Sequence, residues 1–154
     1  MADTVTVRSA TPADAETWLS LVDALADYEK LARPTPEARQ RLVHDAFGPA
    51  PNRIQVYMAE AGGQAVGYAI TCETYSSFLA LPTLYLEDLF VPPDARRLGV
   101  GRAAFRHLAA EALRRGCGRM EWQVLDWNQL AIDFYEKLGA RRMREWYTYR
   151  LTAD

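Results

Sequence analysis

Apolar residues recur along this chain with two different periods, and the change of period predicts where strands and helices lie. Alternation at every second position is typical of strands, and it predicts five of them, at residues 4–8, 54–60, 65–75, 84–91 and 120–125. Apolar residues three and four positions apart are typical of amphipathic helices, and they predict four, over residues 11–29, 35–46, 101–116 and 128–138. Between these segments we expect a hairpin turn at Gly62-Gly63 and a loop over residues 76–82. The tail, Ala140 to Leu151, could form one bent strand or a hairpin.

This order of elements predicts the fold class. Helices and strands neither alternate regularly nor separate into blocks, so a sheet that is all parallel or all antiparallel is not expected. We predict an α/β fold with a mixed sheet flanked by helices, whose central strand–helix–strand unit is parallel and right-handed. The 154 residues contain no repeat and no linker, which predicts one domain over residues 1–154.

Composition excludes several classes of protein. With 49% apolar residues and a net charge of −2, the sequence is typical of an ordinary soluble globular chain. No apolar run approaches the ~20 residues of a membrane span, and the first residues lack a signal-peptide pattern, so we expect a cytoplasmic protein without membrane contact. Cys72 and Cys117 are far apart and only two histidines occur, so neither a disulfide framework nor a metal site is indicated.

Charge is distributed unevenly. Residues 1–90 carry six basic and twelve acidic side chains, whereas residues 91–154 carry twelve basic and eight acidic ones. A basic second half favours a polyanionic ligand and an acidic first half favours a cationic one. Nucleic acid is not expected as a partner, because the sequence pI is near 5.7.

Residues 84–102 form the most informative stretch. An apolar strand stops at Pro92-Pro93, and a turn with Gly99, Gly101 and three arginines leads into a helix. Glycines at a helix start leave backbone N–H groups accessible, and with Arg96, Arg97 and Arg102 they predict a phosphate site. A tight turn with solvated arginines is the alternative.

The same glycines also fit a dinucleotide-binding pattern. Residues 99–104 satisfy G-x-G-x-x-A, and Asp126 follows the next strand, where a ribose-binding acid would lie. Against this, seven residues separate Val91 from Gly99, and too few strands follow for a doubly wound sheet.

Two adjacent carboxylates, Glu87 and Asp88, interrupt the apolar strand. Neighbouring strand residues point to opposite faces, so both can face one pocket only if the strand bulges. We therefore expect a cleft or a bulge here. Alternatively, arginines hold both carboxylates in a structural network.

These motifs resemble those of a known family. Arg96-Arg97-Leu98-Gly99-Val100-Gly101 resembles the R-R-x-G-x-G turn of the GNAT superfamily of N-acetyltransferases, and residues 124–140 resemble its second signature. Tyr28-Glu29, Leu84-Tyr-Leu-Glu-Asp88 and Asp126-Trp-Asn128 are similar to the spermidine/spermine and thialysine acetyltransferase branch. The resemblance covers nearly the whole chain and implies the GNAT acyl-CoA acyltransferase fold.

The resemblance implies acetyl-CoA as co-substrate and no metal. The arginine–glycine turn would cradle the pyrophosphate, and the backbone of the preceding strand would bind the pantetheine arm. The residues implied in binding are Leu89, Phe90, Val91, Arg96, Arg97, Leu98, Gly99, Val100, Gly101, Arg102, Asn128 and Ala131.

The resemblance also implies catalytic roles. Tyr135 would protonate the leaving thiolate, and Glu87 would accept a proton from the amine, directly or through a water. A small cationic acceptor (a polyamine, thialysine or a lysine-like molecule) would be bound by Tyr28, Glu29, Glu87 and Glu145, and a homodimer is expected. Independently of the resemblance, Trp122 could line the amine pocket through stacking or a cation–π contact, with packing in the core as the alternative. From the residues alone, Tyr135 could be a core aromatic and Asn128 a helix cap. A catalytically idle CoA-binding module is the alternative function.

Overall fold

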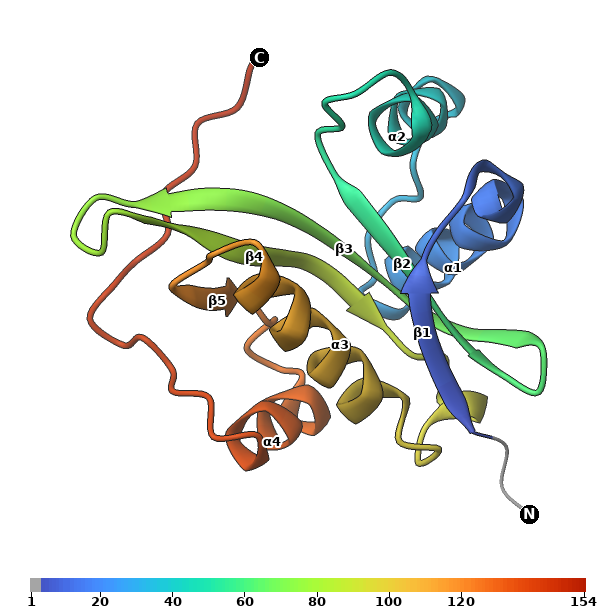
Figure 1. Ribbon diagram of the computed structural model, residues 1–154. Helices are drawn as coiled ribbons and strands as arrows, with labels where there is room; N and C mark the ends of the chain where they lie inside the picture. The colour runs from blue at the N-terminus through green and yellow to red at the C-terminus, as the bar shows by residue number, and fades with distance from the viewer. Residues whose placement is uncertain (1–3) are drawn as a thin grey trace. The chain divides into compact units, whose positions relative to one another are not determined.

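The computed structural model describes residues 4–154, which form two compact units, one ending at Trp122 and one beginning at Gln123 (Figure 1). The expectation of no signal segment rests partly on residues 1–3, which lie outside the described residues. The expectation of a single domain stays a prediction.

Within its described residues, 4–122, the first unit contains five strands, three helices and two short 3-10 turns. In chain order these are β1 (Val5–Ser9), a 3-10 turn (Pro12–Asp14), α1 (Ala15–Tyr28), α2 (Pro36–Phe47), β2 (Gln55–Ala61), β3 (Gln64–Ser76), β4 (Leu81–Phe90), a 3-10 turn (Pro93–Ala95), α3 (Val100–Arg114) and β5 (Arg119–Trp122). The second unit contains α4 (Gln129–Lys137).

The strands form one mixed sheet in the order β1-β2-β3-β4-β5. Neighbours pair antiparallel from β1 to β4, whereas β4 and β5 are parallel and are connected through α3. The predicted mixed α/β sheet, with its central parallel unit, is confirmed.

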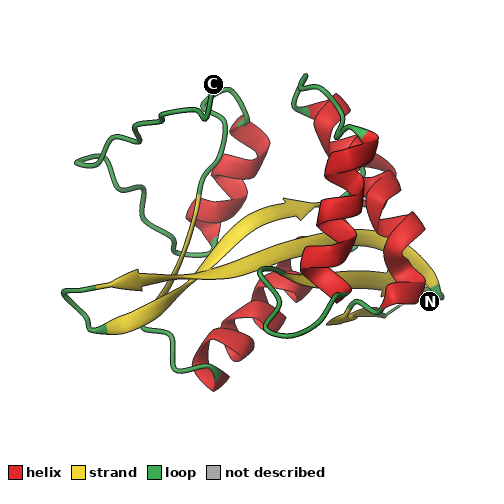
Figure 2. Cartoon of the chain, turned by 90° about the horizontal axis from the view of Figure 1, so that it is seen from above, coloured by secondary structure: helices red, strands yellow, loops and turns green. Residues whose placement is uncertain are grey.

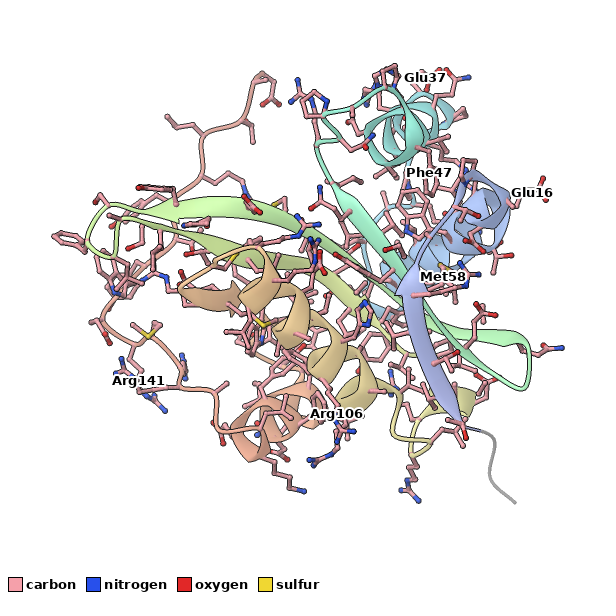
Figure 3. The ribbon with its side chains drawn as sticks, viewed as in Figure 1. Glu16, Glu37, Phe47, Met58, Arg106 and Arg141 are labelled. Atoms are coloured by element: carbon pink, nitrogen blue, oxygen red, sulfur yellow. The ribbon has the colours of Figure 1, made fainter. Side chains whose placement is uncertain are left out.

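Helices cover both faces of this sheet (Figure 2). Even-numbered residues of β2 and β3, such as Met58 and Tyr68, point into an apolar layer with Trp18 of α1 and Phe47 of α2. Figure 3 shows Met58 and Phe47 directed toward this layer. The odd-numbered residues face α3, whose Leu108 is fully buried. The alternation along the strands therefore provides two separate apolar layers.

The bounds of several elements differ from the sequence prediction, most clearly around the loop before β4 and at the end of β5. The loop expected over residues 76–82 is shorter, because β3 continues to Ser76 and β4 begins at Leu81. Serine and proline were interpreted as loop residues, but Pro82 is accommodated within β4, where its carbonyl accepts a hydrogen bond from Gly118 N–H at 2.9 Å. The last strand ends at Trp122, three residues earlier than predicted.

The strand or hairpin predicted for the tail is absent: residues 140–154 contain no helix or strand. A strand requires a neighbour to complete its backbone hydrogen bonds, and the alternation of Tyr147, Tyr149 and Leu151 gives only a suitable pattern of side chains. This expectation was wrong for the isolated chain.

Candidate functional site

Strand β4 contains a bulge at Glu87. Ile70 of β3 pairs with Asp88, but the next residue, Thr71, pairs with Leu86, so Glu87 has no partner in the ladder. Asp88 shares the face of Ile70 and points toward the α1 layer, whereas Glu87 is exposed. The bulge expected from the two adjacent carboxylates is confirmed.

Strands β4 and β5 separate at the same point. Their parallel pairing ends at Leu86 and Trp122, while β4 continues to Phe90. Among the described strands, none pairs with this edge of β4 after Leu86. Backbone polar groups of residues 87–90 on that edge are therefore available to a ligand. The side chain of Phe90 packs in the apolar core, and the predicted role of Phe90 in binding stays a prediction.

Three carboxylates belong to this region, and the negative charges of Glu29 and Glu87 both act on Asp88. Burial, together with the negative charges of Glu87 and Glu29, raises the pKa of Asp88 to about 6, although a hydrogen bond from Tyr68 lowers it. Burial also raises the pKa of Glu29. In the part of the chain that the structure describes, no ion pair joins Glu87 or Asp88 to an arginine, so the arginine-network alternative receives no support. An unneutralised carboxylate cluster is suited to a cation.

Asp88 is a residue to which the sequence analysis gave no role. Its carboxylate Oδ2 accepts the hydroxyl of Tyr68 at 2.9 Å. In the sequence Asp88 could not be distinguished from Glu87, because both are carboxylates in the same apolar strand. Only the register at the bulge shows that Asp88 is the one that points toward the α1 layer.

The arginine–glycine turn has the backbone geometry of an anion site. Arg97 and Gly99 have positive φ angles of 72° and 80°, and helix α3 begins directly afterwards with no side-chain cap. The first helical hydrogen bond joins Ala103 N–H to the carbonyl of Gly99, so the N–H groups of the three residues between them point out of the helix. A nest of backbone donors at a helix N-terminus favours phosphate.

The arginines of the turn have different surroundings. Arg97 and Arg102 are exposed, as is Leu98. Arg96 is partly buried, donates from Nε to the carbonyl of Val91 at 3.2 Å, and lies over the ring of Tyr28, 4.9 Å from its centroid. Arg96 therefore connects the turn with the residue at the end of α1.

Gly67 positions this turn, and sequence reasoning did not identify it. A Cβ atom on Gly67 would lie 2.7 Å from the carbonyl oxygen of Phe90 and 3.3 Å from Cγ1 of Val100. Only glycine allows β3, the end of β4 and the first residue of α3 to approach this closely. Its signal in the sequence was a glycine inside an otherwise apolar strand.

Trp122 at the end of β5 packs its ring edge-on against Phe105 of α3, with centroids 5.0 Å apart. In this contact Trp122 serves the packing of β5 against α3. The expected contribution of Trp122 to an amine pocket stays a prediction.

The remaining predicted residues belong to the second unit. Asn128 caps α4, because its Oδ1 accepts the N–H of Ala131 at 3.3 Å. Tyr135 lies two turns later on the same helix, with its ring 5.8 Å from that of Phe134. Glu145 lies in the exposed tail. Their roles toward a ligand stay predictions.

Residues 4–154 show neither a membrane-spanning helix nor a metal-binding cluster. No helix there is long and apolar enough to cross a bilayer. No group of three or more His, Cys, Asp or Glu side chains is arranged to hold a metal ion.

The chain is similar to known acetyltransferases. A model of the Acetyltransferase (GNAT) family matches residues 18–140. The thialysine N-epsilon-acetyltransferase of Sus scrofa is 32% identical over 166 residues, covering 97% of this chain and 94% of that protein. The L-ornithine N5-acetyltransferase of Arabidopsis thaliana is 43% identical over 88 residues, covering 57% of this chain and 39% of that protein. Among solved structures, aminoglycoside N-acetyltransferase AAC(6')-Iy in complex with CoA has a TM-score of 0.80 and 20% identity, covering 98% of this chain and 97% of that one.

Proposed function

Because this chain belongs to the acetyltransferase (GNAT) family, we propose that it transfers the acetyl group of acetyl-CoA to a primary amine of a small cationic acceptor. The observation that carries this proposal is the coincidence of two features at Glu87. The bulge that exposes Glu87 lies where β4 separates from β5. Carboxylates that can attract a cation therefore lie next to unpaired backbone N–H groups that can bind the carbonyl of an acyl group.

Acetyl-CoA would bind along the arginine–glycine turn and the neighbouring edge of β4. The N-terminus of α3, with Arg96, Arg97 and Arg102, suits the pyrophosphate, and the free edge of β4 suits the pantetheine arm. Bound there, acetyl-CoA supplies an activated acyl group as a thioester.

The carboxylates would prepare the acceptor. An alkyl ammonium has an ordinary pKa of about 10.4 and must lose a proton before its nitrogen can attack. Glu29, Glu87 and Asp88 would attract the cation, and Glu87, directly or through a water, would accept the proton. The nitrogen then forms a bond to the acyl carbon as the bond to sulfur breaks, while N–H groups near Leu89 stabilise the carbonyl oxygen. Tyr135 would return a proton to sulfur.

The acceptor we propose is a lysine-like or polyamine molecule. The names of two relatives specify thialysine and ornithine, which both carry a primary amine at the end of a side chain. The carboxylate cluster of this chain fits such a cation, and Tyr28 at the end of α1 would contact it.

The test combines binding with turnover. Acetyl-CoA at saturation should stabilise the protein against heat by at least ~2 kcal/mol, and NAD at equal concentration should not. A panel of thialysine, ornithine, lysine, spermidine, an aminoglycoside and a neutral amine should then be assayed for thiol release. Stabilisation by NAD alone would favour the dinucleotide alternative, and binding of acetyl-CoA without turnover of any amine would favour the idle module.

A homodimer and a cytoplasmic location are parts of the same proposal. The homodimer is supported by the exposed apolar side chains of the tail, Trp146, Tyr147, Tyr149 and Leu151. The location rests on the composition of the sequence.

A further inference from the structure

Tyr68 carries a polar group in a place where an apolar ring would pack equally well. The residue is 1% exposed and belongs to the core cluster with Trp18 and Met58. Its ring lies 6.4 Å from that of Phe90, its partner in the β3–β4 ladder. A buried hydroxyl is unfavourable unless it forms a hydrogen bond, and the partner here is Asp88, diagonally across the two strands.

The surroundings of Asp88 do not match those of a purely structural carboxylate. The negative charges of Glu29, at the end of α1, and of Glu87, at the bulge, both act on the Asp88 carboxylate. The nearby cation Arg96 lies over the ring of Tyr28 instead. Among residues 4–154, Tyr68 donates the hydrogen bond that this carboxylate accepts, and the bond goes to Oδ2. The other oxygen, Oδ1, is left for a further donor, and an acceptor ammonium is such a donor.

We propose that Tyr68 is a positioning residue, which fixes the orientation of Asp88 and keeps it ionised so that the free carboxylate oxygen receives the acceptor amine. This role rests on the proposed function. It adds Tyr68 of β3 to the carboxylates at the end of α1 and in β4 that would receive the amine.

Tyr68 acts by holding its proton, not by passing it on. Burial and the nearby charge of Asp88 raise the pKa of its phenol far above the ordinary value, so the hydroxyl stays a donor at any working pH. Its ring is enclosed in the core cluster, which restricts the hydroxyl to one direction. The hydrogen bond favours the charged form of Asp88 and opposes the effects of burial, Glu87 and Glu29.

Tyr68→Phe tests this role, because it keeps the ring and removes only the donor. Without the hydrogen bond, the acidic limb of the kcat/KM profile for the best amine should move to higher pH by about one unit, the size expected for one hydrogen bond to a charged acceptor. Tyr57→Phe is the matched control. Tyr57 is equally buried but on the other face of the sheet, against His107, and its loss should leave the limb in place.

A second measurement does not depend on activity. The carboxyl carbon of Asp88, labelled with ¹³C and assigned through Asp88→Asn, should titrate at higher pH in Tyr68→Phe than in the parent. Fluorotyrosine at position 68, a stronger donor, should move the titration the opposite way and serves if Tyr68→Phe does not fold.

The outcomes separate the two proposals. An unchanged Asp88 titration in Tyr68→Phe, or an equal shift in Tyr57→Phe, would overturn the role of Tyr68. A parent protein that acetylates no amine would overturn the proposed function, while the carboxyl titration would still decide whether Tyr68 controls Asp88.

Discussion

The guanidinium of Arg96 lies over the ring of Tyr28, 4.9 Å from the ring centroid. Arg96 belongs to the turn that we assign to the pyrophosphate, and Tyr28 is the last residue of α1, next to Glu29 of the carboxylate cluster. A cation over an aromatic ring contributes about 0.5–2 kcal/mol, depending on desolvation. This contact therefore links the two proposed substrate sites directly.

Arg96→Ala should weaken both substrates. We expect a higher KM for acetyl-CoA, because a charge near the pyrophosphate is lost, and a KM for the amine raised roughly three- to tenfold, because Tyr28 loses its support. Steady-state kinetics with each substrate varied in turn measures both effects. Arg102→Ala is the control: this exposed arginine is on the first turn of α3, and its loss should affect acetyl-CoA alone. Equal effects of the two variants on the amine would contradict the link.

Ionisation of Asp88 should make the protein less stable as the pH rises. The pKa of this carboxyl is about 6 in the folded protein against an ordinary 3.8, so the folded state binds the proton more tightly than the unfolded state. The stabilisation from protonated Asp88 is complete below about pH 3.8 and is lost as pH rises through about 6. At neutral pH the charged carboxylate therefore costs the fold at most about 3 kcal/mol.

Asp88→Asn should remove that cost, since an amide oxygen can still accept the hydroxyl of Tyr68. Urea unfolding should show the variant more stable than the parent at pH 8, with the difference shrinking toward pH 4. Asp27→Asn is a control at an exposed site, where the carboxylate pairs with Arg33. A constant difference across this pH range would exclude Asp88 as the titrating group.

Glu29 should select for the second charge of the acceptor. Glu29→Gln keeps the shape of the side chain and removes its charge, so the KM should rise more for a diamine than for a neutral amine. Glu16→Gln, an exposed carboxylate in the first turn of α1, should change neither. If the diamine and the neutral amine respond equally to Glu29→Gln, then Glu29 does not belong to the pocket.

The sequence predicted the chemistry of β4 better than its geometry. Two adjacent carboxylates in an apolar strand were enough to predict a cleft or a bulge, because in a regular strand neighbouring residues point to opposite faces and cannot both face one pocket. The alternation restarts at Glu87, however, so only the register of the ladder reveals that Asp88 turns toward α1. The hydrogen bond from Tyr68 to Asp88 could not be predicted either, because it also depends on how the strands pair. Tyr68 comes from another strand, and its pattern matches that of any apolar core residue.

The tail shows the opposite case. Tyr147, Tyr149 and Leu151 alternate as strand residues do, but no strand among residues 4–154 pairs with them. Local pattern predicts which side chains would share a face, and it cannot supply the backbone partner that makes a strand.

A second copy of the chain is the partner that we expect for this tail. Light scattering at micromolar concentration should give the mass of a dimer, and removal of residues 146–154 should give a monomer. Trp146→Ala is a milder form of the same change, because it removes a large side chain that is 70% exposed in the single chain. A monomeric full-length protein would refute the homodimer.

The sharpest prediction concerns Tyr135. Tyr135→Phe keeps the ring beside Phe134 and removes the hydroxyl that would protonate the leaving thiolate. General acid catalysis by a placed side chain contributes typically ~10²–10⁴-fold. If chemistry limits turnover, kcat should therefore fall at least ~10²-fold, with the affinity for acetyl-CoA and the melting temperature nearly unchanged. Tyr147→Phe, the same chemical change in the exposed tail, should keep the parent rate.

The thiol of the acyl donor separates a lost proton from a lost contact at Tyr135. A donor with a more acidic thiol needs less protonation as it leaves, so the variant should lose less activity with that donor than with acetyl-CoA. A general disturbance of α4 would instead reduce both rates by the same factor, because it would not depend on the basicity of sulfur. A Tyr135→Phe variant that keeps more than about half of the parent rate in the chemical step would remove Tyr135 from the mechanism, and proton return to sulfur would then come from water.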